Sequence, residues 1–210
     1  MEQNMHNLSV SDHEKITQAI RTAEKKTSGE IYAVVAHRSD DYFFVAGFMA
    51  GLWSVVFGIL VAVIMPEIPA LYLAIAQLAS LTSFLLVFHY FPEWRMLFVP
   101  KSLAYRRASG NAVRQFLAHG IHATSDRSGI LVFVSLAERY AEVVADEGIN
   151  LKVGQEEWDD MVATLTSHAA KGELAEGYLL AIEQAGELLA ANFPPIKGQK
   201  SELDDRLVEI

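Results

Sequence analysis

Two long apolar segments dominate the pattern of hydrophobic and polar positions along the chain. The first covers residues 42–65 and the second covers residues 68–91, and only Pro66 and Glu67 separate them. Glu67 is the one formally charged residue in this whole stretch. A helix of about 20 apolar residues crosses about 30 Å of hydrocarbon, and a helix satisfies its own backbone hydrogen bonds there. The alternative, a buried pair of core helices, would need too much apolar surface for so short a chain. The pattern therefore predicts a transmembrane helical hairpin.

Small residues recur at helical spacing in the first apolar segment. They form one series four residues apart and one GxxxG pair, which are Ala50, Ser54, Gly58 and Ala62, and Gly47 and Gly51. Small side chains let two helix backbones approach closely in lipid, where no hydrophobic force drives helices together. We expect these residues to pack against the second helix or against another copy of the chain. Gln77, near the middle of the second segment, is expected to form an interhelical hydrogen bond rather than a transport site.

The flanks of the apolar segments predict an orientation. Basic residues lie on both sides of the hairpin and none lies in its connection; they are Lys25, Lys26 and Arg38, then Arg95, Lys101, Arg106 and Arg107. Lys and Arg near membrane ends favour the cytoplasmic side. We therefore expect a multi-pass protein of the inner membrane with both termini in the cytoplasm. The first residues contain no apolar stretch of the kind found in a secretory signal.

Shorter periodic segments predict a soluble domain on both sides of the hairpin. Val10, Ser11 and Glu14 have the pattern of a capped helix start. The predicted elements are a helix from 11 to about 28, a strand over 30–37, a helix over 101–119, strands over 130–134 and 140–145, and helices over 155–170 and 173–192. Residues 196–210 are mostly polar, and we expect this tail to be loosely docked or mobile.

The order of these segments predicts an α/β fold. The first two strands are joined by a crossover that includes a helix, which favours parallel neighbours. The second and third strands are separated by a short link, which favours an antiparallel hairpin. We therefore expect a single discontinuous cytoplasmic domain over 1–41 and 92–195, with the transmembrane hairpin inserted after its first strand.

Net charge and cysteine content limit the classes of molecule that this chain is expected to bind. The formal net charge is −9, and the chain contains no cysteine. Disulfides and thiolate metal sites are therefore excluded. An acidic chain without a run of Lys and Arg is atypical of nucleic-acid binding. We expect the lipid bilayer and another membrane or membrane-associated protein as partners, and the sequence leaves self-association open.

The candidate chemistry lies where the second strand begins and the third ends. The predicted strand order brings Asp126 and Arg127 close to Asp146 and Glu147. Carboxylates in loops can bind Ca²⁺ or Mg²⁺, so Asp126, Asp146 and Glu147 are candidate metal ligands or catalytic residues. Arg127 opposes a cation, and it could instead bind a phosphate or carboxylate. We expect Arg127 to pair with Asp146 or Glu147, and we expect no cofactor.

Several segments resemble the TPM-domain family, in particular its bacterial membrane-anchored branch. The matching segments are 27–31, 124–135, 143–149 and 202–207, together with Trp158 and the glycine pattern of Gly172, Gly177 and Gly186. The resemblance implies an α/β/α sandwich, and members have been linked to phosphatase-like activity, divalent-cation binding and the maintenance of membrane protein complexes.

The chain departs from the family pattern at two acidic positions. Many members have Asp-Asn-Gly before the second strand, where this chain has Arg127, Ser128 and Gly129. The third strand of many members runs into Gly-x-Gly-x-Glu, where this chain ends the motif with Asn150. We therefore expect a non-catalytic interaction or assembly module, and the alternative is a divalent-metal-dependent, phosphatase-like hydrolase.

Overall fold

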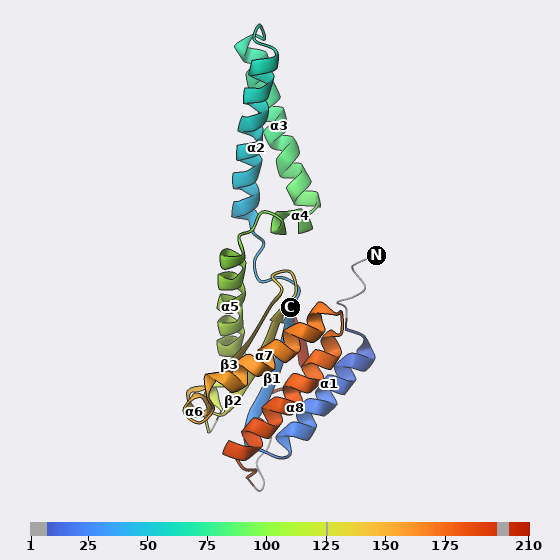
Figure 1. Cartoon of the computed structure of the whole chain (residues 1–210), viewed down its shortest axis with the longest axis vertical. Coiled ribbons are helices and arrows are strands. Elements are labelled where there is room, and N and C mark those ends of the chain that lie inside the picture. Colours follow the sequence, from blue (N-terminus) through green and yellow to red (C-terminus); the bar gives the residue numbers. More distant parts are fainter. Residues whose placement is uncertain (1–7, 125, 197–201) are drawn as a thin grey trace. The chain divides into compact units, whose positions relative to one another are not determined.

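The computed structural model describes residues 8–124, 126–196 and 202–210 (Figure 1). The chain divides into two compact units: a sheet unit, Met1–Ser39 with Tyr105–Ile210, and a hairpin unit, Asp40–Ala104. Residues 92–104 therefore belong to the hairpin unit rather than to the soluble domain in which we had placed them. The reason is local, because Arg95 donates to the carbonyls of Phe88 and Asp41.

The sheet unit is built on four strands in the order β3-β2-β1-β4. Their bounds are β1 Glu30–Ala36, β2 Gly129–Ser135, β3 Tyr140–Ala145 and β4 Leu207–Glu209. β1 and β2 are parallel, and β2 and β3 are antiparallel. Both predicted pairings are confirmed. The sheet therefore brings the starts of β1 and β2 to the same edge as the end of β3.

Helices cover both faces of this sheet, as an α/β/α sandwich requires (Figure 1). One face packs against α1 Val10–Glu24, α7 Gln155–Ala170 and α8 Leu174–Asn192. The other face packs against α5 Lys101–Ala118 through Ala112 and Phe116. β1 serves both cores because successive side chains of a strand point to opposite faces, and all seven of its residues are buried. The predicted fold class is confirmed.

The first helix begins earlier than the sequence suggested. Ser9, not Ser11, is the N-cap of α1, and its side chain accepts from the backbone N–H of Asp12. In turn, the backbone N–H of Ser9 donates to the Asp12 carboxylate at 3.1 Å. Two overlapping Ser-x-x-acid patterns start here, and both have the composition of a capping box. The prediction took the second pattern, and the chain uses the first.

The C-terminal tail was expected to be loosely docked, and this is wrong for its described part. β4 pairs in parallel with β1, with Ala33, Val34 and Val35 opposite Leu207, Val208 and Glu209. Leu207 is buried in the main core. Residues 197–201 lie outside the described residues. The short apolar pair in a polar tail was too weak a signal for a strand, because its pairing partner lies far away in sequence.

The hairpin unit consists of α2 Phe43–Ile64, α3 Ala70–Tyr90 and the short α4 Glu93–Met96. α2 and α3 have 22 and 21 residues with mean hydropathy 2.3 and 2.0, so each is long and apolar enough to span a membrane. Only 17% and 6% of their most apolar windows is buried inside the structure. A core helix of a soluble protein would bury far more of such a surface.

The small residues of α2 divide between two faces. Ala50, Ser54 and Gly58 are buried, and the Ser54 hydroxyl donates to the Gln77 carbonyl of α3 at 3.0 Å. A Cβ atom at Gly47 or Gly51 would meet nothing within 4 Å. Ala62, at the far end of the series, is only partly buried. The series four residues apart therefore lies between the two helices, whereas the GxxxG pair faces away from α3.

Candidate functional site

The loop before β2 holds Arg127 in a turn. The backbone N–H of Arg127 donates to the carbonyl of Thr124 at 3.0 Å, and the Thr124 hydroxyl accepts from the N–H of Ser128. Arg127 has a φ of 49°, in the left-handed region. Its guanidinium forms an ion pair with Glu147, with 2.7 Å between Nη1 and Oε2. The expected pairing of Arg127 with one of the two acidic residues is confirmed, and its partner is Glu147.

Asp146 serves the backbone rather than Arg127. It is the N-cap of α6 Glu147–Asn150, and its Oδ1 accepts from the N–H of Glu147 at 2.7 Å. Asp146 is only 6% exposed, and its Oδ2 is buried without a hydrogen-bond partner among the described residues. The side chain of Asp126, by contrast, is exposed. The three candidate carboxylates therefore share one sheet edge but have three different environments.

Gly148 allows α6 to pack closely against the loop before β2. A Cβ atom at Gly148 would lie 2.6 Å from the carbonyl oxygen of Arg127 and 3.0 Å from that of Asp126. These atoms belong to the backbone and cannot swing aside. The side chain of Asn150 donates to the carbonyl of Ala145 at 3.0 Å, which ties α6 to the end of β3. Among the residues that the structure describes, no group of three or more His, Asp or Glu side chains is arranged to hold a metal ion.

A second acidic cluster lies at the start of β1, and it was not among the candidate sites predicted from the sequence. Glu30 is 4% exposed, and its carboxylate accepts from the backbone N–H groups of Glu202 and Leu203. Glu24 accepts from the N–H of Ile31 at 2.9 Å. Burial raises the pKa of the Glu24 carboxyl to about 8, and the charges of Glu30 and Asp205 act in the same direction. A charged residue opening a buried strand was the available signal for Glu30.

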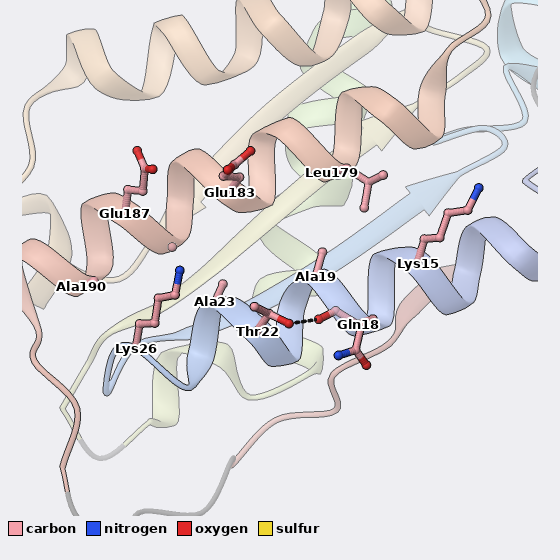
Figure 2. Close-up of a pocket in the computed structure, with 11 residues that line it drawn as sticks. Lys15, Gln18, Ala19, Thr22, Ala23, Lys26, Leu179, Glu183, Glu187 and Ala190 are labelled. Atoms are coloured by element: carbon pink, nitrogen blue, oxygen red, sulfur yellow. Dashed lines mark hydrogen bonds between the residues drawn. The ribbon is translucent and has the colours of Figure 1, made fainter.

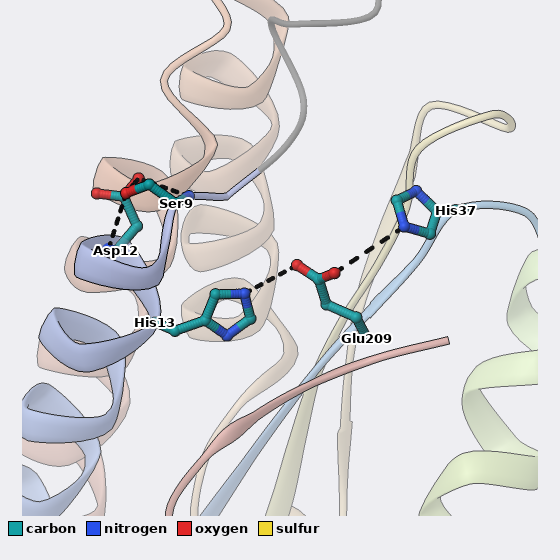
Figure 3. A network of polar contacts seen from close by, with 5 residues as sticks. All are labelled: Ser9, Asp12, His13, His37 and Glu209. Atoms are coloured by element: carbon teal, nitrogen blue, oxygen red, sulfur yellow. Dashed lines mark hydrogen bonds and ion pairs between the residues drawn. The ribbon is translucent and has the colours of Figure 1, made fainter.

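The end of the chain carries a further network (Figure 3). Glu209 accepts from the imidazole of His13 at 2.9 Å and lies 4.0 Å from that of His37. Closer to the start of β1, Arg21 donates to Asp205 at 2.9 Å. These contacts attach the tail to α1 and to the end of β1. They stabilise the position of β4 at the sheet edge.

A groove runs along the surface between α1 and α8 (Figure 2). Its volume is about 460 Å³. Its lining includes two lysines, two glutamates of α8 and three small residues, which are Lys15 in α1, Lys26 just after α1, Glu183 and Glu187, then Ala19, Ala23 and Gly186. A Cβ atom at Gly186 would lie 2.7 Å from the Cβ of Ala23. The groove thus marks the place where the two helices pack closely.

A second groove lies between the edge strand β3 and α7. Its volume is about 340 Å³. Its lining mixes polar and apolar residues and comprises residues 141–145, Asn150, Gln155, Trp158, Asp159 and Val162. Neither groove was visible in the sequence, because each depends on how its two bordering elements pack in space.

Comparison with known proteins identifies the family. The TPM domain matches residues 72–188, which is more than half of the chain. The chain belongs to the TPM-domain family. No curated protein sequence matches it. Its fold is similar to that in the NMR structure of the BA42 protein from the psychrophilic bacterium Bizionia argentinensis, with a TM-score of 0.61 and 20% sequence identity. This similarity covers 100% of this chain and 99% of that one.

Within the TPM domain of this chain, the two departures from the family pattern have structural roles. Arg127 stands before β2 and holds Glu147 in an ion pair. Asn150 stands after β3 and bonds the backbone of Ala145. Both positions are therefore occupied by groups whose described contacts lie within the fold.

Proposed function

We propose that this chain is a membrane-anchored TPM-domain module that binds another membrane or membrane-associated protein, and that it is not a hydrolase. The observation that carries the proposal is the ion pair between Arg127 and Glu147 at 2.7 Å. A guanidinium at this edge opposes the approach of a divalent cation. Asn150 stands where many family members have a glutamate, so this edge carries one carboxylate fewer than the family pattern would offer a hard cation.

The hairpin supports membrane anchoring. The helices α2 and α3 expose most of their apolar surface, which is the arrangement expected for contact with lipid. Basic residues flank the hairpin on both sides, and its connection holds only Glu67 as a charged residue. By the distribution of Lys and Arg, the sheet unit and both termini belong on the cytoplasmic side of the inner membrane.

The partner is expected to be a protein rather than a nucleic acid. The net charge of −9 opposes binding to phosphate backbones. Grooves at the α1/α8 and β3/α7 surfaces supply contact area outside the candidate acidic edge.

The experiment uses the purified full chain in detergent micelles. We expect no hydrolysis of p-nitrophenyl phosphate above the blank with Mg²⁺ or Ca²⁺. Divalent-dependent hydrolysis that disappears in Asp146→Asn would overturn the non-catalytic part of the proposal and favour the alternative hydrolase.

Anchoring and partner binding are tested in membranes. The tagged full chain should stay in the membrane fraction after alkaline carbonate extraction, and cross-linking there should yield a reproducible protein complex. An unrelated protein with two membrane spans serves as the control. Release by carbonate, or cross-linked products identical to those of the control, would contradict the proposal.

A further inference from the structure

The outer edge of β3 presents backbone groups that none of the other described strands pairs with. β3 ends the sheet order β3-β2-β1-β4, so only one of its sides is paired. The N–H of Asp146 donates to the carbonyl of Gly129 in β2, whereas the carbonyl of Ala145 accepts from Asn150. In an antiparallel ladder, alternate residues bond the partner strand. The N–H and C=O groups of Ala141 and Val143 therefore point away from β2.

These outward groups have no hydrogen-bond partner among the described residues. The opposite edge of the sheet differs, because β4 is only three residues long. Short edge strands are one way in which proteins avoid unwanted pairing. β3 has six residues and so offers a full repeat of donors and acceptors for an added strand.

The groove beside this edge gives room for an added strand. It lies between β3 and α7 and has a volume of about 340 Å³. On the α7 side its β3 residues are Ala141, Val143 and Ala145, which carry small side chains. Trp158 of α7 also lines the groove, and its indole N–H has no partner among the described residues. A peptide backbone could approach β3 here without displacing a large side chain.

The groove is acidic. Glu142 and Asp159 line it, and no Lys or Arg is among its lining residues. The Glu142 carboxylate points to the α5 face of β3, where the Ser109 hydroxyl donates to its Oε1 at 3.4 Å, so Asp159 is the carboxylate on the α7 side of the groove. A basic side chain on the α7 face of a bound segment could pair with Asp159.

We propose that the partner of this module docks as an extended segment carrying lysine or arginine, which adds to the open edge of β3. This inference rests on the proposed function and names the binding mode, which is strand addition. Main-chain hydrogen bonds to Ala141 and Val143 give affinity, and Asp159 on the α7 side selects for basic side chains. A second copy of this chain is a poorer occupant, because pairing two β3 edges would bring acidic linings together.

The test is hydrogen exchange on the full chain in detergent micelles, measured with residue resolution. The probe is a β-prone peptide of about seven residues that alternates lysine with valine, and the matched probe carries glutamate instead of lysine. At about 1 mM lysine peptide, the amides of Ala141 and Val143 should exchange more slowly. The amides of β4 should not change, and the glutamate peptide should protect neither edge.

Two variants separate the backbone contribution from the charge contribution. Val143→Pro removes an outward N–H, which an edge strand tolerates, and should weaken lysine-peptide binding about tenfold. Asp159→Asn should weaken it about threefold. Asp160→Asn is the matched control, because it removes the same charge from the same helix outside the groove lining, and it should leave binding unchanged.

Three outcomes would overturn the inference. They are the absence of slowed exchange at Ala141 and Val143, equal protection by both peptides, and protection of Ala141 and Val143 that appears only as the chain concentration rises, which would indicate self-pairing. If one of these outcomes occurs but cross-linking in membranes still yields a complex, the proposed interaction function stands and only the docking site is wrong. If hydrolysis appears while the lysine peptide binds β3, the non-catalytic proposal fails and the docking site stands.

Discussion

Three residues near the end of β3 make close contacts with the backbone around them. Asp146 caps α6, Asn150 bonds the Ala145 carbonyl, and Gly148 allows α6 to touch the preceding loop. A side chain that already satisfies the backbone is less free to bind a ligand. Ligand binding here therefore depends on which individual side chains are already engaged, rather than on the total charge of the cluster.

Gly148 provides a direct test of this close contact. Gly148→Ala should destabilise the fold by about 1–3 kcal/mol, because the added Cβ would overlap backbone atoms that cannot move alone. Chemical denaturation measures the change. Gly110→Ala is the control, because a Cβ there meets nothing within 4 Å in the middle of α5, and it should stabilise by about 0.5–1 kcal/mol. Equal effects of the two substitutions would refute the contact.

Glu24 predicts a pH dependence of stability. Its pKa is about 8 in the fold against an ordinary value of 4.5, so the folded state retains a proton that the unfolded state has lost between these values. The free energy of unfolding should therefore fall as pH rises from 4.5 to about 8. Glu24→Gln should flatten this slope and match the wild type near the acidic end. Unfolding titrations at several pH values measure it, and an unchanged slope in the variant would contradict the assignment.

Among the elements, the hairpin helices show that spacing alone does not say which face packs. The series containing Ser54 and Gly58 lies against α3, whereas Gly47 and Gly51 lie on another face of the same helix. Small residues in either series would let another helix backbone approach α2 closely. Which series contacts α3 depends on how the two helices cross. Residue spacing does not reveal the unpaired edge of β3 either, because that edge follows from the order of the strands in the sheet.

Packing within the hairpin can be tested by cross-linking. Ser54→Leu together with Gly58→Leu should weaken the contact between α2 and α3, because the added side chains obstruct backbone approach. Cysteines introduced at Ala50 and Leu81, which lie in one apolar cluster, should then form a disulfide several-fold more slowly. Gly47→Leu is the control and should leave the rate unchanged. A rate unaffected by the double substitution would count against the packing.

On the scale of the whole molecule, the sheet unit is interrupted in sequence by a complete helical hairpin. The chain leaves the sheet unit after Ser39 and returns at Tyr105, yet β1 and β2 pair along their whole length. The chain thus passes from the sheet unit to the hairpin unit and back again. An insertion with an even number of membrane spans would likewise return the chain to the side on which it started.

The orientation makes a prediction for the whole chain. Reporter fusions at Met5 and at Ile210 should both be active in the cytoplasm, because the basic residues flank the hairpin on the side of the termini. A fusion in the connection near Glu67 should be active only outside. Activity of either terminal fusion in an exported compartment would show the reverse orientation.

Local patterns in the sequence were sufficient for much of this protein. The apolar segments, the seven-residue strand β1 and the helices α5, α7 and α8 follow from periodicity, because burial on one face repeats with the local backbone geometry. The parallel and antiparallel strand pairs followed from connection lengths, and from them the pairing of Arg127 with Asp146 or Glu147, of which the structure selects Glu147. All of these depend on interactions between near neighbours or on the order of segments.

Only the tertiary structure decided the rest. Glu30 meets Glu202 across 172 positions, and β4 forms because β1 has a free edge, not because its own three residues favour a strand. The raised pKa of Glu24 comes from burial beneath distant segments. The groove at β3 exists because α7 packs beside an edge that no other strand covers. Such features depend on which surfaces meet in space, and a sequence pattern with a period of a few residues contains no record of that.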